Sequence, residues 1–198
     1  RPLKIKISSL AEQSNGSVLV QYGETTVLVT ATMGKTEKPY LGFFPLTVEY
    51  EERFYAAGKI FGSRFIRREG RPSESAILNA RLIDRSIRPF FDDGLTREVQ
   101  VVATVLSFDN ENDPDFPALI GASLALGISD IPWNGPISGL RIAQKNGEIF
   151  INPTYQEREE ADFDIFLSGK EGKIAMLEIE AKEAKEERIL EAIRIAQE

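Results

Sequence analysis

The chain has 198 residues, with 24 Lys and Arg against 31 Asp and Glu for a net charge of −7, and it contains neither Cys nor His. Its 42% hydrophobic and 28% charged residues indicate a globular protein of one large or two small domains, which excludes disorder and fibrous structure. The missing residue types exclude disulfides, a zinc site with the usual ligands, a thiol nucleophile and a Ser-His-Asp relay. Chemistry by this chain must come from carboxylates, hydroxyls, Lys, Arg or backbone groups.

The amino end has no signal-peptide pattern, and the longest apolar runs, such as residues 18–20, are far too short to cross a bilayer. We therefore expect a soluble, cytoplasmic protein. The sequence begins at Arg1 without a Met, in a stretch where Leu3, Ile5 and Ile7 alternate with polar residues. This beginning suggests a truncated amino end or a piece of a longer chain.

The first hundred residues predict mainly strands. Residues 17–22 and 25–32 alternate apolar and polar side chains around Gly23-Glu24, which is typical of a hairpin with one buried face, and residues 46–51 show the same pattern. Residues 98–108 are β-branched and apolar enough for a central strand.

Two helices are expected in this first part of the chain. Residues 74–88 have helical composition, follow Pro72-Ser73, and are stopped by Pro89. Residues 117–128 form a helix of small residues, which would let it pack close to a sheet. The clearest break in the chain then comes at the cluster of Pro132, Asn134, Gly135 and Pro136.

Beyond the break, the pattern predicts four strands and a helix. Residues 140–145 and 148–152 flank Asn146-Gly147, a strong type I′ hairpin signal. Residues 163–167 and 174–179 form a second strand pair, and residues 183–197 form an amphipathic helix. Its apolar side is expected to carry Ile189, Leu190, Ile193 and Ala196. The fold class is therefore α+β, with a first part at 1–135 and a smaller part at 136–198.

The charge is unevenly distributed. Residues 64–97 hold eight arginines, five acidic residues and no lysine, a net charge of +3, so the rest of the chain carries −10. Arg offers a planar fork that pairs with phosphate and stacks on bases, whereas Lys is the ordinary cation of a solvated surface. A cluster of arginines alone favours oxyanion recognition, although pairing with Glu69, Glu74 and Asp84 is a plain alternative.

Three of these arginines share one face of the expected helix at 74–88. At 100° per residue, Arg81, Arg85 and Arg88 fall within a wedge of about 60°, while apolar residues spread over most of the remaining circumference. This pattern predicts a helix buried on most sides, with its arginine stripe lining a cleft that attracts anions. The alternative is that the stripe is tied down by acids such as Asp84, which stands at i,i+4 to Arg88.

The loop expected before this helix combines aromatic and basic residues. Phe65 and Ile66 stand beside Arg67 and Arg68, with glycines at 62 and 70 permitting a loop. Stacking beside Arg-phosphate pairing is a common way to bind single-stranded nucleic acid. A core Phe and Ile flanked by surface arginines remain the alternative.

Two apparent motifs are rejected. Asp109, Glu111, Asp113 and Asp115 have the spacing of the first half of a calcium loop, but Pro114 stands where the turn glycine belongs, so we interpret them as an acidic connection. Residues 57–59 lack the hydroxyl and the upstream Gly of a phosphate-binding P-loop.

The order of several segments resembles the first RNase PH-type core domain of the bacterial polynucleotide phosphorylase family. The resemblance runs over essentially the whole chain and rests on NGSVLV at 15–20, FPLTV at 44–48, YAAGKI at 55–60, RREGRPSE at 67–74, RLIDRSIRP at 81–89, NDPD at 112–115 and IPWNGP at 131–136. It implies an RNase PH-like fold of the ribosomal-protein β-α-β-α type, in which a mixed sheet packs with helices. The two parts of the chain would then form one core domain of a longer chain.

The resemblance also implies a function. Enzymes of this family degrade single-stranded RNA from its 3′ end with inorganic phosphate, release nucleoside diphosphates, and can run backwards as polymerases. They are magnesium-dependent homotrimers with two core domains, a helical linker, and KH and OB-fold modules.

By this resemblance, residues 65–68 occupy the loop that grips the RNA, where the family more often has a second Phe in place of Ile66. Arg81, Arg85 and Arg88 match arginines that line the active site. The family's catalytic and metal-holding residues lie in the second core domain, so we assign no catalytic and no metal residue here and expect the isolated chain to be inactive. The alternatives are a stand-alone RNase PH, an exosome ring subunit, or a non-catalytic RNA-binding or ring-assembly module.

Overall fold

The computed structural model describes residues 1–7, 10–40, 42–60, 62 and 70–197. Its first half contains β1 (Leu3–Ile7), β2 (Gly16–Tyr22), β3 (Thr25–Met33), β4 (Leu46–Glu52), the 3-10 turn η1 (Phe54–Ala57), α1 (Glu74–Ile87), the 3-10 turn η2 (Arg88–Phe90), β5 (Val99–Ser107) and α2 (Asp115–Gly127). The second half contains β6 (Ser138–Lys145), β7 (Glu148–Ile151), α3 (Tyr155–Glu159), β8 (Phe163–Lys170), β9 (Lys173–Ala181) and α4 (Glu186–Gln197).

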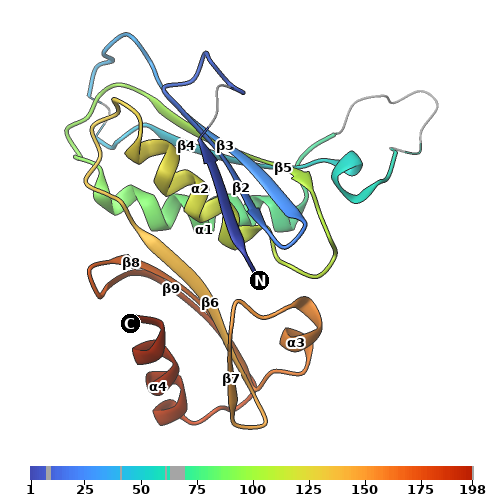
Figure 1. Ribbon diagram of the computed structural model, residues 1–198. Helices are drawn as coiled ribbons and strands as arrows, with labels where there is room; N and C mark the ends of the chain where they lie inside the picture. The colour runs from blue at the N-terminus through green and yellow to red at the C-terminus, as the bar shows by residue number, and fades with distance from the viewer. Residues whose placement is uncertain (8–9, 41, 61, 63–69, 198) are drawn as a thin grey trace.

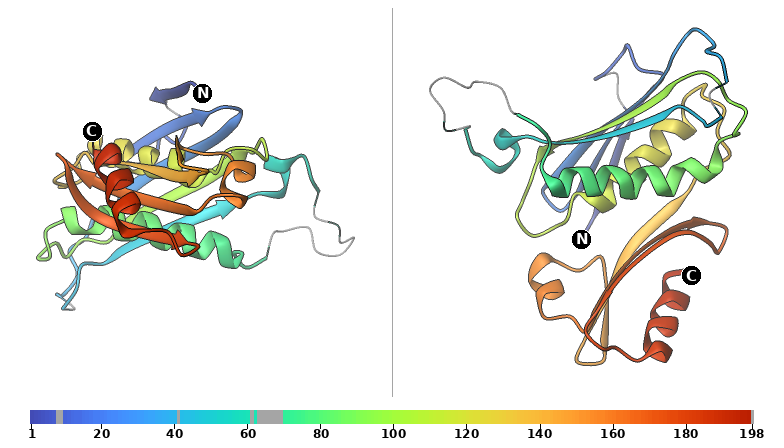
Figure 2. Two further views of the ribbon diagram at one scale, coloured as in Figure 1. Left: turned by 90° about the horizontal axis from the view of Figure 1, so that it is seen from below. Right: turned by 180° about the vertical axis from the view of Figure 1, so that it is seen from behind.

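The strands form two sheets with helices between and outside them. The first sheet has the order β1-β2-β3-β5-β4, in which only β4 and β5 run parallel, and the second has the order β7-β6-β8-β9 and is antiparallel. Figure 1 shows α1 and α2 between the two sheets, with α4 against the far face of the second sheet. The view from behind in Figure 2 shows the same layers. The α+β fold expected from the sequence is confirmed.

Alternating apolar residues explain the first sheet. Val18 and Val20 on β2 and Val27 and Val29 on β3 are completely buried against the helices, as the hairpin pattern predicted. The turn between the two strands contains Gly23 at φ +61°, a left-handed conformation that suits glycine. As expected, β5 takes a central place, between β3 and β4.

The predicted close approach of the small-residue helix to the sheet is also confirmed. A Cβ placed on Gly121 of α2 would come within 2.5 Å of Val29 Cγ2 and 3.3 Å of Val20 Cγ2. Glycine is therefore needed at this position because the sheet leaves no room for a side chain.

The second sheet follows the predicted hairpins. Asn146 and Gly147 have φ of 52° and 82°, and a type I′ turn requires positive φ at both central residues. One face of this sheet packs Phe166 and Met176 into the core that includes α1 and α2. The other face packs Phe163 and Ile165 into a smaller cluster with α4.

The predicted burial of α1 on most sides is wrong, and the predicted apolar side of α4 is wrong at one residue. The side of α1 that carries Ile77 and Leu78 is open, with these residues 50% and 61% exposed, because α1 lies over β4 at the edge of the sheet and is covered on only part of its circumference. On α4, Ile189, Ile193 and Ala196 pack against the second core cluster as predicted, whereas Leu190 is 54% exposed and the buried residue is Ala192. The contact face of α4 is centred on Ala192, about 160° around the helix from Leu190.

The short helix α3 was not predicted. Thr154 caps it in a capping box, in which the Thr154 hydroxyl accepts from the Glu157 N–H and the Glu157 carboxylate accepts from the Thr154 N–H. In the described part of the chain, no helix is both long and apolar enough to span a membrane.

Candidate functional site

Two of the three arginines singled out from the sequence lie on the exposed face of α1. Arg81 and Arg85 are exposed, and within the described residues neither guanidinium has a hydrogen bond or an ion pair. The buried face of α1 is formed by Leu82, Ile83 and Ile87 on the other side of the helix. Among the described residues, Arg81 and Arg85 therefore present two unneutralised planar cations.

Arg88 is bound within the protein instead. Its Nε and Nη2 donate to the two carboxylate oxygens of Asp84 at 2.9 and 2.6 Å, which is the i,i+4 pair considered as the alternative. Nη1 and Nη2 also donate to the backbone carbonyls of Phe44 and Leu46 at 3.0 and 3.2 Å. Arg88 therefore ties the end of α1 to the start of β4, and its predicted role in lining an active site remains a prediction.

The start of α1 is fixed by a hydroxyl cluster. Ser73 is the N-cap and accepts from the Ala76 N–H at 3.0 Å, while its hydroxyl donates to Glu52 at the end of β4 at 2.7 Å. Ser75 donates to the same carboxylate at 3.2 Å. These contacts hold the end of β4 and the start of α1 together. Residues 65–68, the predicted RNA-gripping loop in this segment, lie outside the described residues.

A cleft of about 1100 Å³ opens beside α1, between the two halves of the molecule. Its described lining includes six Lys and Arg and eight Asp and Glu, and it does not include Arg81, Arg85 or Arg88. Because its wall as a whole is more acidic than basic, the cleft interior does not concentrate anions. The arginine stripe was expected to line a cleft, and the structure places it outside this one.

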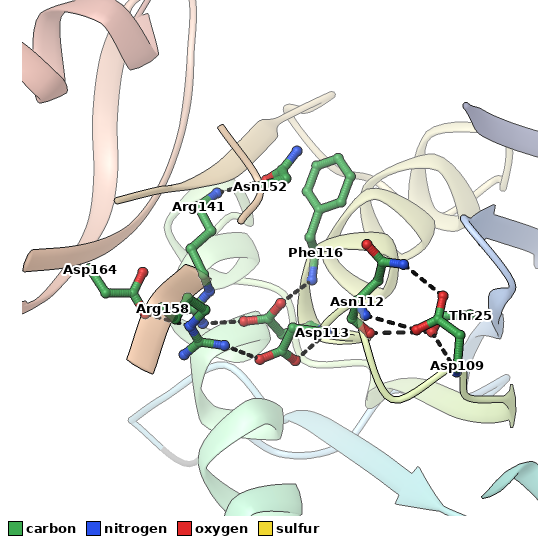
Figure 3. A network of polar contacts seen from close by, with 10 residues as sticks. Thr25, Asp109, Asn112, Asp113, Phe116, Arg141, Asn152, Arg158 and Asp164 are labelled. Atoms are coloured by element: carbon green, nitrogen blue, oxygen red, sulfur yellow. Dashed lines mark hydrogen bonds and ion pairs between the residues drawn. The ribbon is translucent and has the colours of Figure 1, made fainter. Parts of the chain in front are cut away.

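The polar floor of the cleft is a network of alternating charges (Figure 3). Arg141 on β6 pairs with Asp115 at the start of α2 and, at 2.8 Å, with Asp164 on β8. Arg158 on α3 pairs with Asp164 at 2.7 Å and with Asp113 at 2.6 Å. The network therefore joins the connection between β5 and α2 to the second sheet.

Burial shifts the pKa values within this network. Asp115 is completely buried, and its burial and the nearby Asp113 carboxylate raise its pKa to about 6 despite the opposing effect of Arg141. Burial would lower the pKa of Arg141, but the carboxylates of Asp115 and Asp164 outweigh it and raise that pKa. Arg141 therefore stays charged.

Asp109 organises the acidic connection itself. Its carboxylate accepts from the backbone N–H groups of Glu24, Glu111 and Asn112 and from the Asn112 side chain, at 2.6 to 3.1 Å. Partial burial raises its pKa, but these hydrogen bonds outweigh it, and the pKa falls to about 2. The segment is thus a structured turn, consistent with its interpretation as a connection.

The carboxylates of the network fit a divalent cation poorly. Asp113, Asp115 and Asp164 are each neutralised by an arginine, and a cation would have to displace Arg141 or Arg158. Among the described residues, no group of three or more acidic side chains is arranged to hold a metal ion.

Arg141 and Arg158 were not singled out from the sequence. They lie outside the arginine-rich window, and their partners are 23 to 45 residues away along the chain, except that Arg158 and Asp164 are 6 apart. The signals that could have found them are weak. The Thr154 capping box predicts the helix that carries Arg158, and the run of aspartates before α2 needs cations.

Comparison with known protein families shows to which family the chain belongs. Residues 1–132 match the 3′ exoribonuclease family, domain 1, and residues 135–198 match domain 2 of the same family. The chain belongs to the 3′ exoribonuclease family.

Curated relatives are close in sequence. The polyribonucleotide nucleotidyltransferase of Exiguobacterium sibiricum is 54% identical over 193 residues, which cover 98% of this chain and 26% of that protein. The Lysinibacillus sphaericus protein of the same name is 53% identical over 198 residues, covering 100% of this chain and 28% of that protein. The chain thus spans about a quarter of the length of these relatives.

Two solved structures share the fold. A chain of the Archaeoglobus fulgidus exosome with RNA bound to the active site has a TM-score of 0.76 and 19% identity, and the match covers 100% of this chain and 84% of that chain. An archaeal exosome core chain has a TM-score of 0.74 and 18% identity, and the match covers 100% of this chain and 82% of that chain. At this identity the likeness shows the fold alone, and it confirms the RNase PH-like architecture.

Proposed function

We propose that this chain is the first RNase PH-type core domain of an enzyme that degrades RNA from its 3′ end by phosphorolysis. The products are nucleoside diphosphates, and the reaction is reversible. The observation that carries the proposal is the identity of 53–54% to polyribonucleotide nucleotidyltransferases of which the chain spans about a quarter. Residues 1–135 and 136–198 would be the two parts of this one core domain.

The contribution of this chain is to bind and position RNA. Arg81 and Arg85 are suited to hold phosphate groups of the RNA backbone or the phosphate co-substrate, since their donors have no partner among the described residues. Arg88 would act mainly by fixing the end of α1, because its donors are already used. The incoming strand would be gripped by the loop residues Phe65, Ile66, Arg67 and Arg68.

The chemical step is assigned to a part of the enzyme outside this chain. An oxygen of inorganic phosphate would attack the phosphorus of the terminal phosphodiester and form the P–O–P bond of the released nucleoside diphosphate. The bond from that phosphorus to the 3′ oxygen of the preceding nucleotide would break, and this oxygen would take up a proton and become the 3′ hydroxyl of the shortened RNA, while cations offset the charge on the transferring phosphoryl group. The aspartates of the network are held in ion pairs, so none of these described residues is free to act as an acid or base. Magnesium dependence, a homotrimeric assembly and a cytoplasmic location are further parts of this proposal.

The test is phosphate-dependent release of ADP from poly(A). The full-length protein, incubated with poly(A), magnesium and phosphate, should release ADP, and omitting phosphate should abolish the release. No phosphate-dependent product would overturn the proposal.

The isolated 198-residue chain provides the matching control. We expect it to release little or no ADP under the same conditions, as a non-catalytic RNA-binding unit would. Robust phosphorolysis by this chain alone would contradict the assignment of chemistry to another part and would favour a stand-alone RNase PH.

A further inference from the structure

The second sheet ends in an edge strand that has no role in the function proposed above. β9 pairs with β8 on one side, and within the described residues no strand pairs with its other side. Of the nine residues of β9, only Met176 is buried. The backbone N–H and C=O groups that point away from β8 therefore form an open row, to which a further strand can be added.

One face of β9 is apolar and only partly covered. Leu177 and Ile179 stand opposite Leu167 and Ile165 of β8, so they lie on the face of the sheet that packs against α4. Leu167 and Ile165 are buried in the cluster with α4, whereas Leu177 and Ile179 are 37% and 42% exposed. The cover that α4 provides therefore ends at β8 and leaves the apolar side of β9 open.

The opposite face of β9 is acidic. Glu178 and Glu180 alternate with the two apolar residues, are exposed, and line the cleft beside α1. Among the described residues neither carboxylate has an ion pair or a hydrogen bond. Lys182, which follows β9, donates instead to the backbone carbonyl of Glu159 at 3.0 Å. Glu178 and Glu180 therefore leave two negative charges on this edge of the sheet.

The two faces of β9 define the side chains that an added strand needs. Successive side chains of a strand point to opposite faces of a sheet, so one set would lie beside Leu177 and Ile179 and the other set beside Glu178 and Glu180. Aliphatic side chains in the first set would cover the exposed apolar residues. Lys or Arg in the second set would pair with the two carboxylates. The complementary segment is therefore an alternation of aliphatic and basic residues.

We propose that β9 is a docking edge for an extended segment of a partner protein in which aliphatic residues alternate with Lys or Arg. Backbone hydrogen bonds to β9 would supply affinity, and the alternating side chains would supply specificity.

A partner segment fits this edge better than a second copy of the chain does. β9 of a second copy would bring two acidic faces together. β1 has the required alternation, but it spans five residues against the nine of β9. Its start is also held by Arg1, which donates to the Asn152 carbonyl in the second half of its own chain at 3.2 Å.

The experiment titrates a fluorescent peptide of alternating Val and Lys, with the length of β9, into the full-length protein. We expect this peptide to bind at least about fivefold more tightly than a peptide of alternating Val and Glu, because its lysines would lie beside Glu178 and Glu180. A third peptide keeps the Val and Lys side chains but has an N-methylated backbone, which cannot donate to β9, and should not bind. Equal binding of any two of these peptides, or no binding of the first, would overturn the inference.

Charge reversal on β9 locates the binding site. Glu178→Lys combined with Glu180→Lys should invert the preference, so that the Val-Glu peptide binds at least about fivefold more tightly than the Val-Lys peptide. Glu148→Lys is the control, since Glu148 is exposed on β7 at the opposite edge of the same sheet, and it should leave the preference for the Val-Lys peptide unchanged.

Thermal unfolding of each variant shows that it is folded. An unchanged peptide preference in the double variant would overturn the inference. A change in its oligomeric state without a change in peptide preference, measured by light scattering, would assign β9 to a contact between copies and would also overturn it.

Discussion

At the scale of single residues, Arg81 and Arg85 of α1 and Arg88 just after it have different surroundings. Arg88 makes four hydrogen bonds to Asp84, Phe44 and Leu46, whereas Arg81 and Arg85 have no partner within the described residues. We predict that Arg88→Ala lowers the free energy of unfolding by about 1–2 kcal/mol, because these bonds join α1 to β4. Urea denaturation of the variant measures this loss.

Arg81→Ala and Arg85→Ala are the controls for this prediction. Each should change the free energy of unfolding by less than about 0.5 kcal/mol, as expected for an exposed side chain without partners. An equal loss of unfolding free energy in all three variants would contradict the distinction between Arg88 and the two exposed arginines.

A second prediction at this scale concerns Asp109. Its pKa in the folded protein is about 2, below the ordinary value of 3.8, so the folded state binds fewer protons than the unfolded state. The stabilisation is present above about pH 4 and is lost as the pH falls towards about 2. Asp109→Asn should remove this pH dependence, and comparing urea denaturation of the variant and the wild type from about pH 5 to about pH 2 measures it. If the free energies of unfolding of the variant and the wild type differed by the same amount at every pH in that range, the lowered pKa of Asp109 would be contradicted.

At the scale of elements, the contact between α2 and the first sheet leaves no room for a side chain at Gly121. Gly121→Ala would place a Cβ 2.5 Å from Val29 Cγ2, so we predict a loss of about 1–3 kcal/mol in the free energy of unfolding. Gly127→Ala at the end of the same helix meets no atom within 4 Å and should be neutral or stabilising by up to about 1 kcal/mol. Thermal denaturation of the two variants separates these effects, and equal behaviour would contradict the close packing.

The sequence pattern predicted most helices and strands because residues close together in the chain determine where they form. The β2–β3 hairpin and the Asn146-Gly147 turn follow from alternation and from turn residues that accept positive φ. The exposure of Leu78 and Leu190 could not be predicted in this way, since it depends on where α1 and α4 lie against their sheets. The Asp-Arg network was missed for the same reason: its partners meet only after the two halves have packed.

At the scale of the molecule, the two halves are joined by buried charges and by a shared core. Arg141 and Arg158 hold the connection before α2 to the second half, and Ser168 on β8 donates to Ser86 on α1 at 2.8 Å. The aspartates at the floor of the cleft are thus committed to structure, while Arg81 lies outside the cleft on α1, without a partner among the described residues. This arrangement suits a domain that positions RNA for chemistry supplied elsewhere.

The most direct test of this claim is to compare turnover and RNA affinity of the full-length protein with and without Arg85. For Arg85→Ala we predict that phosphate-dependent ADP release from poly(A) falls at least about tenfold, because a donor for the reacting phosphates is lost, while the dissociation constant for RNA rises less than about threefold. Unchanged turnover, or equal losses in turnover and affinity, would contradict the account.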